Sequence, residues 1–551
     1  TAFQPGRRRL LHAGLVAALG GLLAGFWALP LVVRLPYSND MGWEKLVEYG
    51  RLLFPAELRW VMGLAVAGVV VSALRGCRTG AALAALALIT GLAFRFAPET
   101  RLWNGRLLPF WFLSIYLLAG VAVASLPRAV AWLLGAERGR GERVGVMAMP
   151  MLALVAAFTF LDGTLDVRWW PSPLHPEQRP FLPDWVKWNY AGYEDEGKPR
   201  REEYFQLVRT MEDLGRTHGC GRAMWEYEFE LNDMGTPMAL MLLPYWTDGC
   251  VGSMEGLYFE SSATTPYHFL VQSELSAAPS RAQRDLPYGP LDVATGVEHL
   301  KRLGVRYYMA ISPEAQAQAR GVPDLRLVAT SGPWSVRYKE ELEERTWEIY
   351  EVSGSELVSP LENEPVVLGG VDHGRAWLDA AAKWHQDPSL ASVVLAADGP
   401  DDWRRIQAPE VRGPRFPIRP ATVSDIRVED DRISFDVDRP GSPVLVKASY
   451  FPNWQATGAD GPWRATPNLM VVVPTERHVE LHYGTTAVDR MGWALTLAGL
   501  AGTVVVARRR RPMDEDRTGA EEPAAAEEDV DRELSEVLAV PAVVTGTDEP
   551  G

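Results

Sequence analysis

The sequence has 551 residues, three cysteines and a formal net charge of -15. A chain of this length is expected to form several domains. Residues 513–551 hold thirteen acidic side chains against two arginines, so most of the negative charge lies there. The remainder is only mildly acidic, which argues against nucleic acid as a partner. Because the chain begins at Thr1 without a signal-peptide pattern, we expect a further N-terminal portion to precede it.

Six apolar windows are near the roughly 17–25 residues that cross a bilayer. They cover residues 10–33, 58–74, 80–97, 107–126, 144–160 and 488–507. A surface helix of a soluble protein keeps a polar face, which these windows lack. The pattern therefore predicts a polytopic α-helical membrane protein with about six transmembrane helices.

Short basic clusters alternate with longer loops of mixed charge between these windows. The clusters lie at residues 6–9, 75–78, 137–143 and 507–511. By the positive-inside rule, both termini are predicted to be cytoplasmic and the long segment 161–487 extracytoplasmic. We expect a bacterial plasma membrane protein that passes the membrane several times.

The exterior segment is predicted to contain an α/β domain and a β-sandwich. Residues 201–216 have the pattern of an amphipathic helix, and residues 296–311 that of a helix and a strand joined at Gly304. Short alternating strands follow from residue 425, with Ile433, Leu481 and Tyr483 among the side chains expected to face inward. Transmembrane helices one to five are predicted in residues 1–160, and the last transmembrane helix in 488–507. Between them we expect the extracytoplasmic α/β domain in 161–360 and the extracytoplasmic region ending in a β-sandwich in 361–487. Residues 508–551 are predicted to form a disordered acidic cytoplasmic tail.

Two of the three cysteines fall in the exterior segment, where disulfides persist. Cys220 and Cys250 are thirty residues apart and are predicted to form a disulfide worth about 3 kcal/mol. Cys77 falls in a cytoplasmic loop of this topology and is expected to be free.

An acidic and aromatic stretch, residues 225–270, is the first candidate for a functional site. In residues 225–230 aromatic side chains alternate with Glu226, Glu228 and Glu230, which predicts a strand with three carboxylates on one face. A solvated strand face is the simpler interpretation. The functional one is an acidic site for a hydroxyl-rich or cationic ligand, completed by Asp233, Asp248, Glu255 or Glu260.

Two further patterns each allow a structural and a functional interpretation, the latter being a metal site in one case and a phosphate site in the other. His478, Glu480 and His482 share one face of a predicted strand. No fourth ligand is evident, so a polar outer face is favoured and no metal is predicted, although a divalent cation stays open. Arg101 and Arg106 flank the fourth apolar window, where they serve either as interfacial anchors or as partners of a lipid phosphate.

Three segments resemble a known family. They are SYFPNWQATGADGPWRATPN (449–468), HLKRLGVRYYMAI (299–311) and TWEIYEV (346–352). From about residue 296 to 507 the chain resembles YfhO-like bacterial membrane proteins and the related 6-pyruvoyl-tetrahydropterin-synthase-related membrane proteins, which are similar to GT-C glycosyltransferases. The resemblance implies a polyprenyl-phosphate sugar donor and a catalytic carboxylate in the first exterior loop. Asp40 occupies that loop, but no GT-C motif surrounds it.

The sequence therefore predicts a membrane-embedded GT-C-like glycosyltransferase, or its C-terminal part, acting in cell-envelope glycan assembly without a cofactor. Its partners would be a membrane lipid or lipid-linked sugar and an envelope glycan. Trp454 and Trp463 would be stacking platforms for the acceptor, or else part of the sandwich core. The alternative is a non-enzymatic, membrane-anchored glycan-binding or envelope assembly module. A transporter is less favoured, because the apolar windows carry few ionisable groups.

Overall fold

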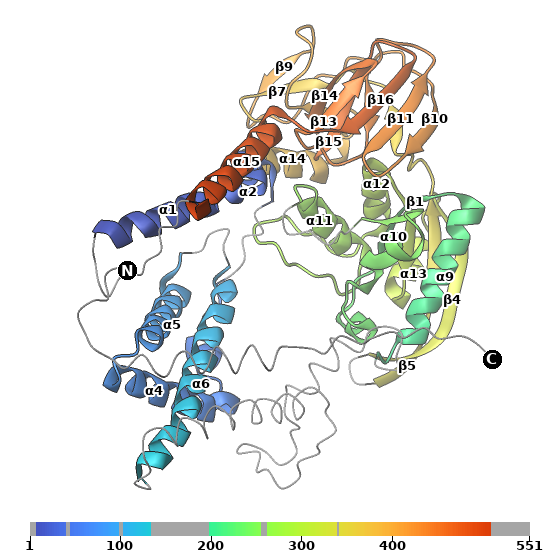
Figure 1. Ribbon diagram of the computed structural model, residues 1–551. Helices are drawn as coiled ribbons and strands as arrows, with labels where there is room; N and C mark the ends of the chain where they lie inside the picture. The colour runs from blue at the N-terminus through green and yellow to red at the C-terminus, as the bar shows by residue number, and fades with distance from the viewer. Residues whose placement is uncertain are drawn as a thin grey trace, which may run out of the picture. The chain divides into compact units, whose positions relative to one another are not determined.

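The computed structural model describes residues 7–39, 45–98, 103–133, 198–254, 262–338 and 341–508. The chain divides into two compact units, residues 1–30 together with 487–551, and residues 31–486. Figure 1 labels the helices and strands of both units.

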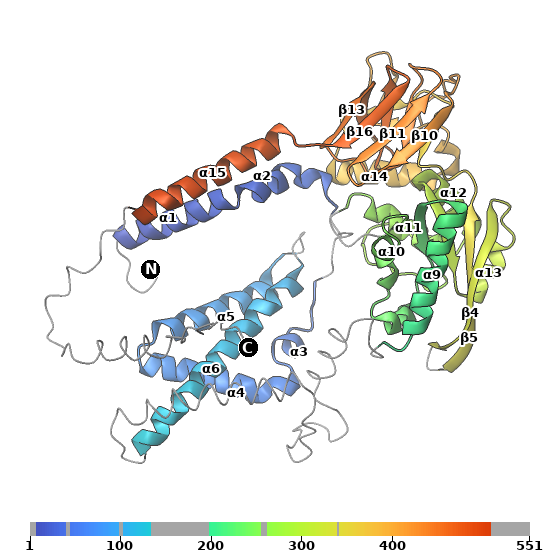
Figure 2. The same ribbon diagram turned by 45° about the vertical axis from the view of Figure 1, so that its right-hand side comes forward.

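The first unit pairs the two ends of the described chain. Helix α1 (Arg7–Leu23) runs beside α15 (Ala487–Arg508), and α2 (Gly25–Arg34) follows α1 after a short break (Figures 1 and 2). The helices approach closely at Gly492, where an added Cβ would lie 2.7 Å from the carbonyl oxygen of Gly25. Small residues allow such close helix packing inside a membrane.

A threonine of α15 satisfies backbone groups at the break between α1 and α2. Its hydroxyl accepts a hydrogen bond from the amide of Phe26 at 2.9 Å and donates one to the carbonyl of Leu23 at 3.2 Å. This hydroxyl belongs to Thr496, which is buried. A broken helix in a bilayer needs such a partner, because no water is present to bond its free backbone groups.

Within the second unit, three apolar helices pack together. They are α4 (Arg59–Leu74), α5 (Arg78–Phe96) and α6 (Leu108–Leu133), preceded by the short α3 (Tyr49–Leu53) (Figure 2). Phe94 and Leu118 lie in their shared core. The buried side chain of Asn104 bonds both backbone groups of Leu46 and the carbonyl of Phe94, so it fixes the loops at one end of the group.

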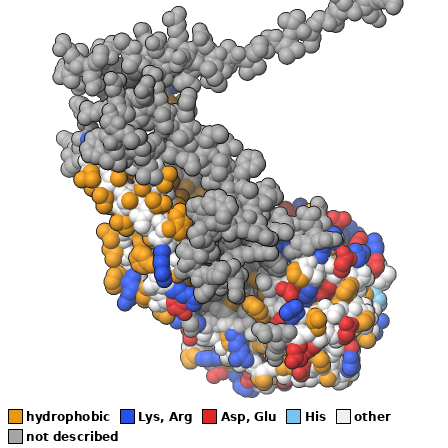
Figure 3. Space-filling model, turned by 90° about the horizontal axis from the view of Figure 1, so that it is seen from below, with side chains coloured by type: hydrophobic (Ala, Val, Ile, Leu, Met, Phe, Trp, Pro, Cys, Tyr) orange, Lys and Arg blue, Asp and Glu red, His pale blue; other side chains and the backbone are white. Residues whose placement is uncertain are grey.

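Three helices in the described part of the chain are long and apolar enough to cross a membrane, and a bent pair would make a fourth. The three spans are Arg78–Phe96, Asn104–Ser125 and Ala487–Arg508, and the pair is Leu11–Leu23 with Gly25–Tyr37, bent by 74°. Helix α4 is shorter, and the predicted window 144–160 lies outside the described residues. The predicted number of six is therefore not confirmed. Hydrophobic side chains gather over one region of the surface in Figure 3, whereas charged side chains are interspersed over another.

The second unit also contains a five-stranded mixed sheet in the order β2-β1-β3-β5-β4. Its strands are β1 (Gly221–Trp225), β2 (Val251–Ser253), β3 (Val305–Ala310), β4 (Leu325–Tyr338) and β5 (Glu341–Val352). Helix α9 (Arg201–His218) covers one face through Tyr204, Leu207 and Met211. Helices α11 (Thr265–Leu275), α12 (Val293–Leu303) and α13 (Pro313–Ala319) share a core with the other face. The predicted amphipathic helix is confirmed, as is the helix–strand unit, in which Gly304 is left-handed.

Two further sheets form a β-sandwich. One sheet has four strands, β10 (Val423–Val428), β11 (Arg432–Val437), β16 (His478–Tyr483) and β13 (Trp454–Thr457). The other has seven, β6 (Val358–Pro360), β12 (Val444–Val446), β15 (Leu469–Pro474), β14 (Ala459–Ala465), β8 (Leu395–Ala396), β7 (Val366–Gly369) and β9 (Arg405–Gln407). Ile433, Phe435 and Leu481 are buried in the core between the sheets, as predicted. Tyr483 was expected there too, but it is 44% exposed because it ends its strand, where its ring contacts Phe451 and Trp454 instead.

The sandwich and the α/β part share one apolar core. Alternate residues of β15 face opposite sides, so that Met470 packs inside the sandwich and Val471 packs toward α11 and α12. Helix α14 (Gly374–Gln386) contributes Trp377 to the same shared core. The two parts therefore bury apolar surface against each other.

Two buried cations bond backbone carbonyls across this junction. Arg222 of β1 donates to the carbonyls of Leu303 and Lys447, and the ammonium of Lys447 donates to the carbonyl of Lys301 at 2.8 Å. Burial lowers the pKa of Lys447 to about 8 and that of Arg222 to about 10, because the charged forms lose hydration.

The predicted disulfide between Cys220 and Cys250 is present, and Cys77 is free. We expect the double replacement Cys220→Ser with Cys250→Ser to lower the free energy of unfolding of the exterior part by about 3 kcal/mol, because the unfolded chain gains loop entropy. Denaturant unfolding followed by tryptophan fluorescence measures this change. Cys77→Ser is the control and should leave the midpoint unchanged. An unchanged midpoint in the double variant would contradict the prediction.

The junction lysine gives a pH-dependent expectation. Its pKa falls from 10.5 in the unfolded chain to about 8 in the fold, so the unfolded state binds the extra proton between these values and stability rises with pH there. Lys447→Met removes the cost of burying the charge and should raise the free energy of unfolding at pH 7 by about 2 kcal/mol. The variant's gain in free energy of unfolding over the wild type should shrink between pH 8 and pH 10.5. Denaturant unfolding at several pH values measures it. A gain that is equal at both ends of this range would contradict the prediction.

Candidate functional site

The acidic stretch after β1 is not a strand. Strand β1 ends at Trp225, and a 3-10 helix, η4 (Phe229–Met234), begins four residues later. Glu226 and Glu228 are only 1% and 3% exposed, whereas Phe229 is 72% exposed. The predicted alternation of buried aromatic and solvated acidic side chains is therefore wrong. Local periodicity misled here because both carboxylates have backbone or arginine partners inside the fold.

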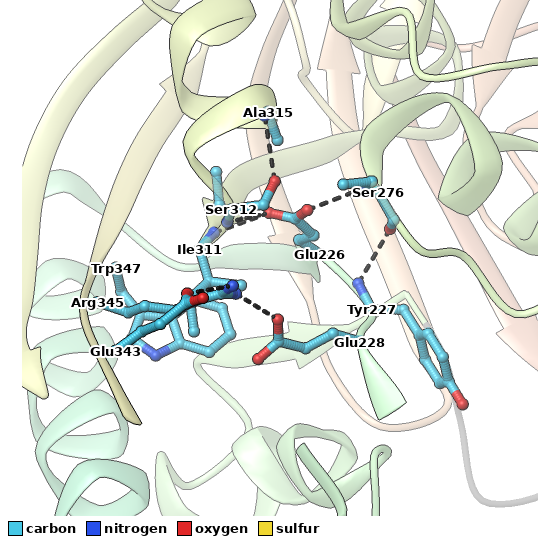
Figure 4. Close-up of polar contacts among 12 residues, drawn as sticks. Glu226, Tyr227, Glu228, Ser276, Ile311, Ser312, Ala315, Glu343, Arg345 and Trp347 are labelled. Carbon is cyan, nitrogen blue, oxygen red and sulfur yellow. Dashed lines mark hydrogen bonds and ion pairs between the residues drawn. The ribbon is translucent and has the colours of Figure 1, made fainter. Parts of the chain in front are cut away.

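Glu226 acts as an internal cap for two loops (Figure 4). One carboxylate oxygen accepts hydrogen bonds from the amides of Ile311 and Ser312, both at 2.8 Å. The other accepts from the amide of Ala277 at 3.0 Å. Both oxygens thus accept hydrogen bonds from backbone amides, which indicates a structural role. The acceptor-binding role of Glu226 stays a prediction.

Glu228 belongs to a buried charge network that links α9 to β5. Its oxygens accept from Arg200 at 3.3 Å and from Arg345 at 2.8 Å. Arg200 also bonds Glu203, which accepts a hydrogen bond from the indole nitrogen of Trp347 at 2.6 Å. Buried ion pairs of this kind are retained only when their members are paired and hydrogen-bonded. We therefore assign the network a structural role.

The structure does not gather the other predicted site residues into one place. Asp248 is exposed in the turn between α10 (Leu243–Trp246) and β2, with a φ of 48°. Arg106 is exposed in the 3-10 helix η3 (Asn104–Leu107). Asp40, Arg101 and Glu255 lie outside the described residues.

The two candidate stacking tryptophans belong to different sheets. Trp454 lies on β13 and packs at the edge of the sandwich core, with its ring 5.5 Å from that of Tyr483. Trp463 lies on β14 and packs against the shared core, 5.5 Å from the ring of Trp403. Both are only partly buried, so each supports its core with one part of the ring, and a role in acceptor stacking stays a prediction.

The histidine and glutamate face of β16 is occupied by neighbouring side chains. His478 contacts Asp436 at 2.6 Å, and Glu480 pairs with Arg432. Within the described ranges, no group of three histidine, cysteine or acidic residues is placed to hold a metal ion.

A cluster that the sequence analysis did not single out as a site forms around Arg464 of β14. The guanidinium lies 4.8 Å from the ring centre of Trp377 and 5.9 Å from that of Tyr37. The rings of Tyr37 and Tyr450 are 6.1 Å apart. We call this set, together with Tyr267, the Arg464 cluster.

Hydrogen bonds hold the guanidinium from one side. Its Nε donates to the side-chain oxygen of Asn468 at 2.9 Å, and a terminal nitrogen donates to the carbonyl of Asp372 at 2.9 Å. The amide of Asn468 donates in turn to the hydroxyl of Thr264 at 3.1 Å, and that hydroxyl contacts Ser449. These hydrogen bonds connect Arg464 to the start of α11 and to the loop between β12 and β13.

The electrostatics of the cluster are unusual for an arginine. Arg464 is 5% exposed, and in the described part of the chain it forms no ion pair. Burial lowers its pKa to about 10, so it still carries its charge at neutral pH. Burial also raises the pKa of Tyr267 and of Tyr450, so both phenols keep their protons and can donate hydrogen bonds.

Tyr37 connects the cluster along the chain to a candidate membrane segment. Tyr37 is the last residue of the bent apolar pair, and Arg34 donates to the hydroxyl of Thr486 at 2.9 Å. Thr486 directly precedes α15 in the sequence. Tyr450 and Arg464 both lie in the segment 449–468, which carried the family resemblance. That segment was the one sequence signal able to point here.

The capping role of Glu226 gives a direct test. Glu226→Gln places an amide nitrogen against a backbone donor, and it should lower the free energy of unfolding by about 2 kcal/mol, since hydrogen bonds to a charged acceptor are lost. Denaturant unfolding measures the change, with Glu212→Gln on the exposed side of α9 as the control. Wild-type stability combined with a loss of glycan binding alone would show instead that Glu226 serves a ligand.

No protein-family model and no curated protein matches the chain. Among solved structures, it is similar to the arabinofuranosyltransferase AftD from Mycobacteria, with 14% identity and a TM-score of 0.35 over 88% of this chain and 42% of that one. A mutant form of AftD gives 16% identity and a TM-score of 0.32 over 85% and 43% of the two chains. The chain thus spans less than half the length of these enzymes. A likeness at these scores carries no argument about function, and the family resemblance stays a prediction.

Proposed function

We propose that the chain is part of a GT-C-like glycosyltransferase of the bacterial plasma membrane. It would transfer a sugar from a polyprenyl-phosphate donor to a cell-envelope glycan on the outer side. The proposal is supported by apolar helices of membrane length in the same chain as a large β-rich domain, and by the family resemblance of residues 296–507.

The Arg464 cluster is the observation that carries the proposal furthest. Ligand sites combine aromatic walls with a few fixed polar groups, and arginine is well suited to phosphate. The cluster offers both, and its member Tyr37 comes three residues after Arg34, the last residue of α2. A donor that is anchored in the bilayer by its lipid would present its phosphate and sugar near the end of such a segment.

The proposed catalytic carboxylate follows the cluster closely in sequence. Asp40 comes three residues after Tyr37, so their Cα atoms are at most about 11 Å apart. The preceding residue, Asn39, donates a hydrogen bond to the side chain of Gln283 at 2.9 Å. This bond ties the start of the first exterior loop to the exterior domain. Asp40 would act there as general base toward the acceptor hydroxyl.

A non-enzymatic glycan-binding or envelope assembly module is the second candidate. One observation favours it. Of the predicted acidic site residues that the structure describes, Glu226 is fully bonded inside the fold and Asp248 is exposed in a turn. Glu226 and Asp248 therefore do not form a pair of carboxylates for acid–base chemistry. A glycan-binding module would need no such pair, because it binds glycan without turnover.

A sugar-transfer assay tests the first candidate. It uses the purified full chain in lipid nanodiscs and a panel of polyprenyl-phosphate sugars, with and without added Mg²⁺. Asp40→Asn should lower kcat by about 10²-fold or more, because it removes the general base. Radiolabel transferred to an envelope glycan acceptor measures the rate.

Glu44→Gln is a matched control in the same loop and should keep wild-type turnover. Transfer that is unaffected by Asp40→Asn would remove Asp40 from the mechanism. Glycan binding without transfer from any donor would favour the second candidate.

A further inference from the structure

The strongest unexplained feature outside the predicted sites is a buried cation that forms no ion pair with any described residue. Arg464 has two hydrogen-bond acceptors, the side chain of Asn468 and the carbonyl of Asp372, and both are neutral. The nearby carboxylate of Asp372 instead contacts His373, and both of these side chains are exposed. A buried charge normally has a partner of opposite sign, because desolvation is costly.

A second, independent observation comes from α11. The hydroxyl of Tyr267 is fully buried and has no hydrogen-bond partner among the described residues. It lies within electrostatic reach of Arg464, and its ring packs at 5.4 Å from that of His385. A buried hydroxyl without a partner calls for a specific explanation, because such groups are rare in native folds.

Together these two groups point to a ligand, and we propose that Arg464 and Tyr267 form the floor of a binding site for a phosphoryl group. The partly buried rings of Tyr37, Tyr450 and Phe451 flank this floor. The guanidinium supplies the positive charge, and Tyr267 donates its hydroxyl hydrogen to a phosphoryl oxygen.

The chemistry favours a phosphoryl group over a neutral sugar alone. Charge-assisted bonds from arginine to phosphate are strong, and an anion would pair directly with a guanidinium that forms no ion pair among the described residues. Three tyrosine hydroxyls around Arg464, those of Tyr37, Tyr267 and Tyr450, remain protonated donors for the several oxygens of a phosphoryl group. A neutral ligand would leave the charge of Arg464 as it is.

Two sources can deliver this group. One is a lipid whose phosphate is held in the bilayer, and the other is a soluble sugar phosphate. The site follows from Arg464 and Tyr267 alone. Only the identification of its ligand with the sugar donor rests on the proposed function.

Phosphate binding to the purified full chain tests the site. The first arm titrates inorganic phosphate into the chain in nanodiscs of phosphatidylcholine and follows thermal unfolding, with sodium chloride at equal ionic strength as the reference. The second arm compares nanodiscs with and without phosphatidic acid. A shift in the first arm indicates a soluble source, and a shift in the second alone indicates a lipid source.

Tyr267→Phe is the decisive variant, because it removes a hydroxyl that has no partner within the described protein and keeps the ring. It should leave the unfolding temperature without ligand equal or higher, and it should weaken phosphate binding about tenfold, as expected for one charged hydrogen bond. Arg464→Gln should abolish the phosphate response. Tyr308→Phe is the control, because that hydroxyl bonds the carbonyl of Leu275. It should lower stability and keep the phosphate affinity.

The proposal is overturned if neither phosphate arm shifts the wild-type unfolding temperature, or if Tyr267→Phe binds phosphate as tightly as the wild type. If Arg464→Gln does not fold, the result for Tyr267→Phe still decides. Phosphate binding without sugar transfer would reject the proposed function and leave the site standing. Sugar transfer without phosphate binding at Arg464 and Tyr267 would reject the site alone.

Discussion

The sandwich and the α/β part depend on one apolar core that lies between the seven-stranded sheet and the helices of the α/β part. Strands β12 and β15 of this sheet are buried on both faces, so alternate residues such as Met470 and Val471 contribute to two different cores. Trp377 of α14 fills the same space from a third direction. Because burial of apolar surface is the main stabilising term, neither part can move away from the other without exposing this core.

Several buried polar side chains have a common structural role. Glu226, Asn104 and Thr496 all form hydrogen bonds with backbone groups of distant segments, which fixes loops or helix ends in place. A buried polar group that is fully bonded in this way adds rigidity without a net cost. Arg464 and Tyr267 differ from these three, since Arg464 forms no ion pair and the hydroxyl of Tyr267 has no hydrogen-bond partner among the described residues.

Much of the fold was predictable, and the reason is periodicity. Helix α9 and the strands β11 and β16 bury the residues that their sequence patterns indicate, and the helix–strand unit at Gly304 has the expected geometry. The candidate site was far less predictable. Glu226 and Glu228 have the spacing of a solvated strand face, yet their partners lie up to 117 residues away in the sequence. Tyr37, Tyr267 and Arg464 come from three segments separated by roughly two hundred residues each, so no local pattern could group them.

The sequence by itself determined the apolar segments, the strand and helix periods and the pairing of Cys220 with Cys250, because each depends on residues that are close along the chain or on a very small set of possible partners. Only the tertiary structure decided which carboxylates accept hydrogen bonds inside the fold, and which polar side chains gather around Arg464. The physical reason is that secondary structure responds to local hydrophobic patterns, whereas the partners of a buried charge are supplied by whichever distant segments the packed core brings beside it.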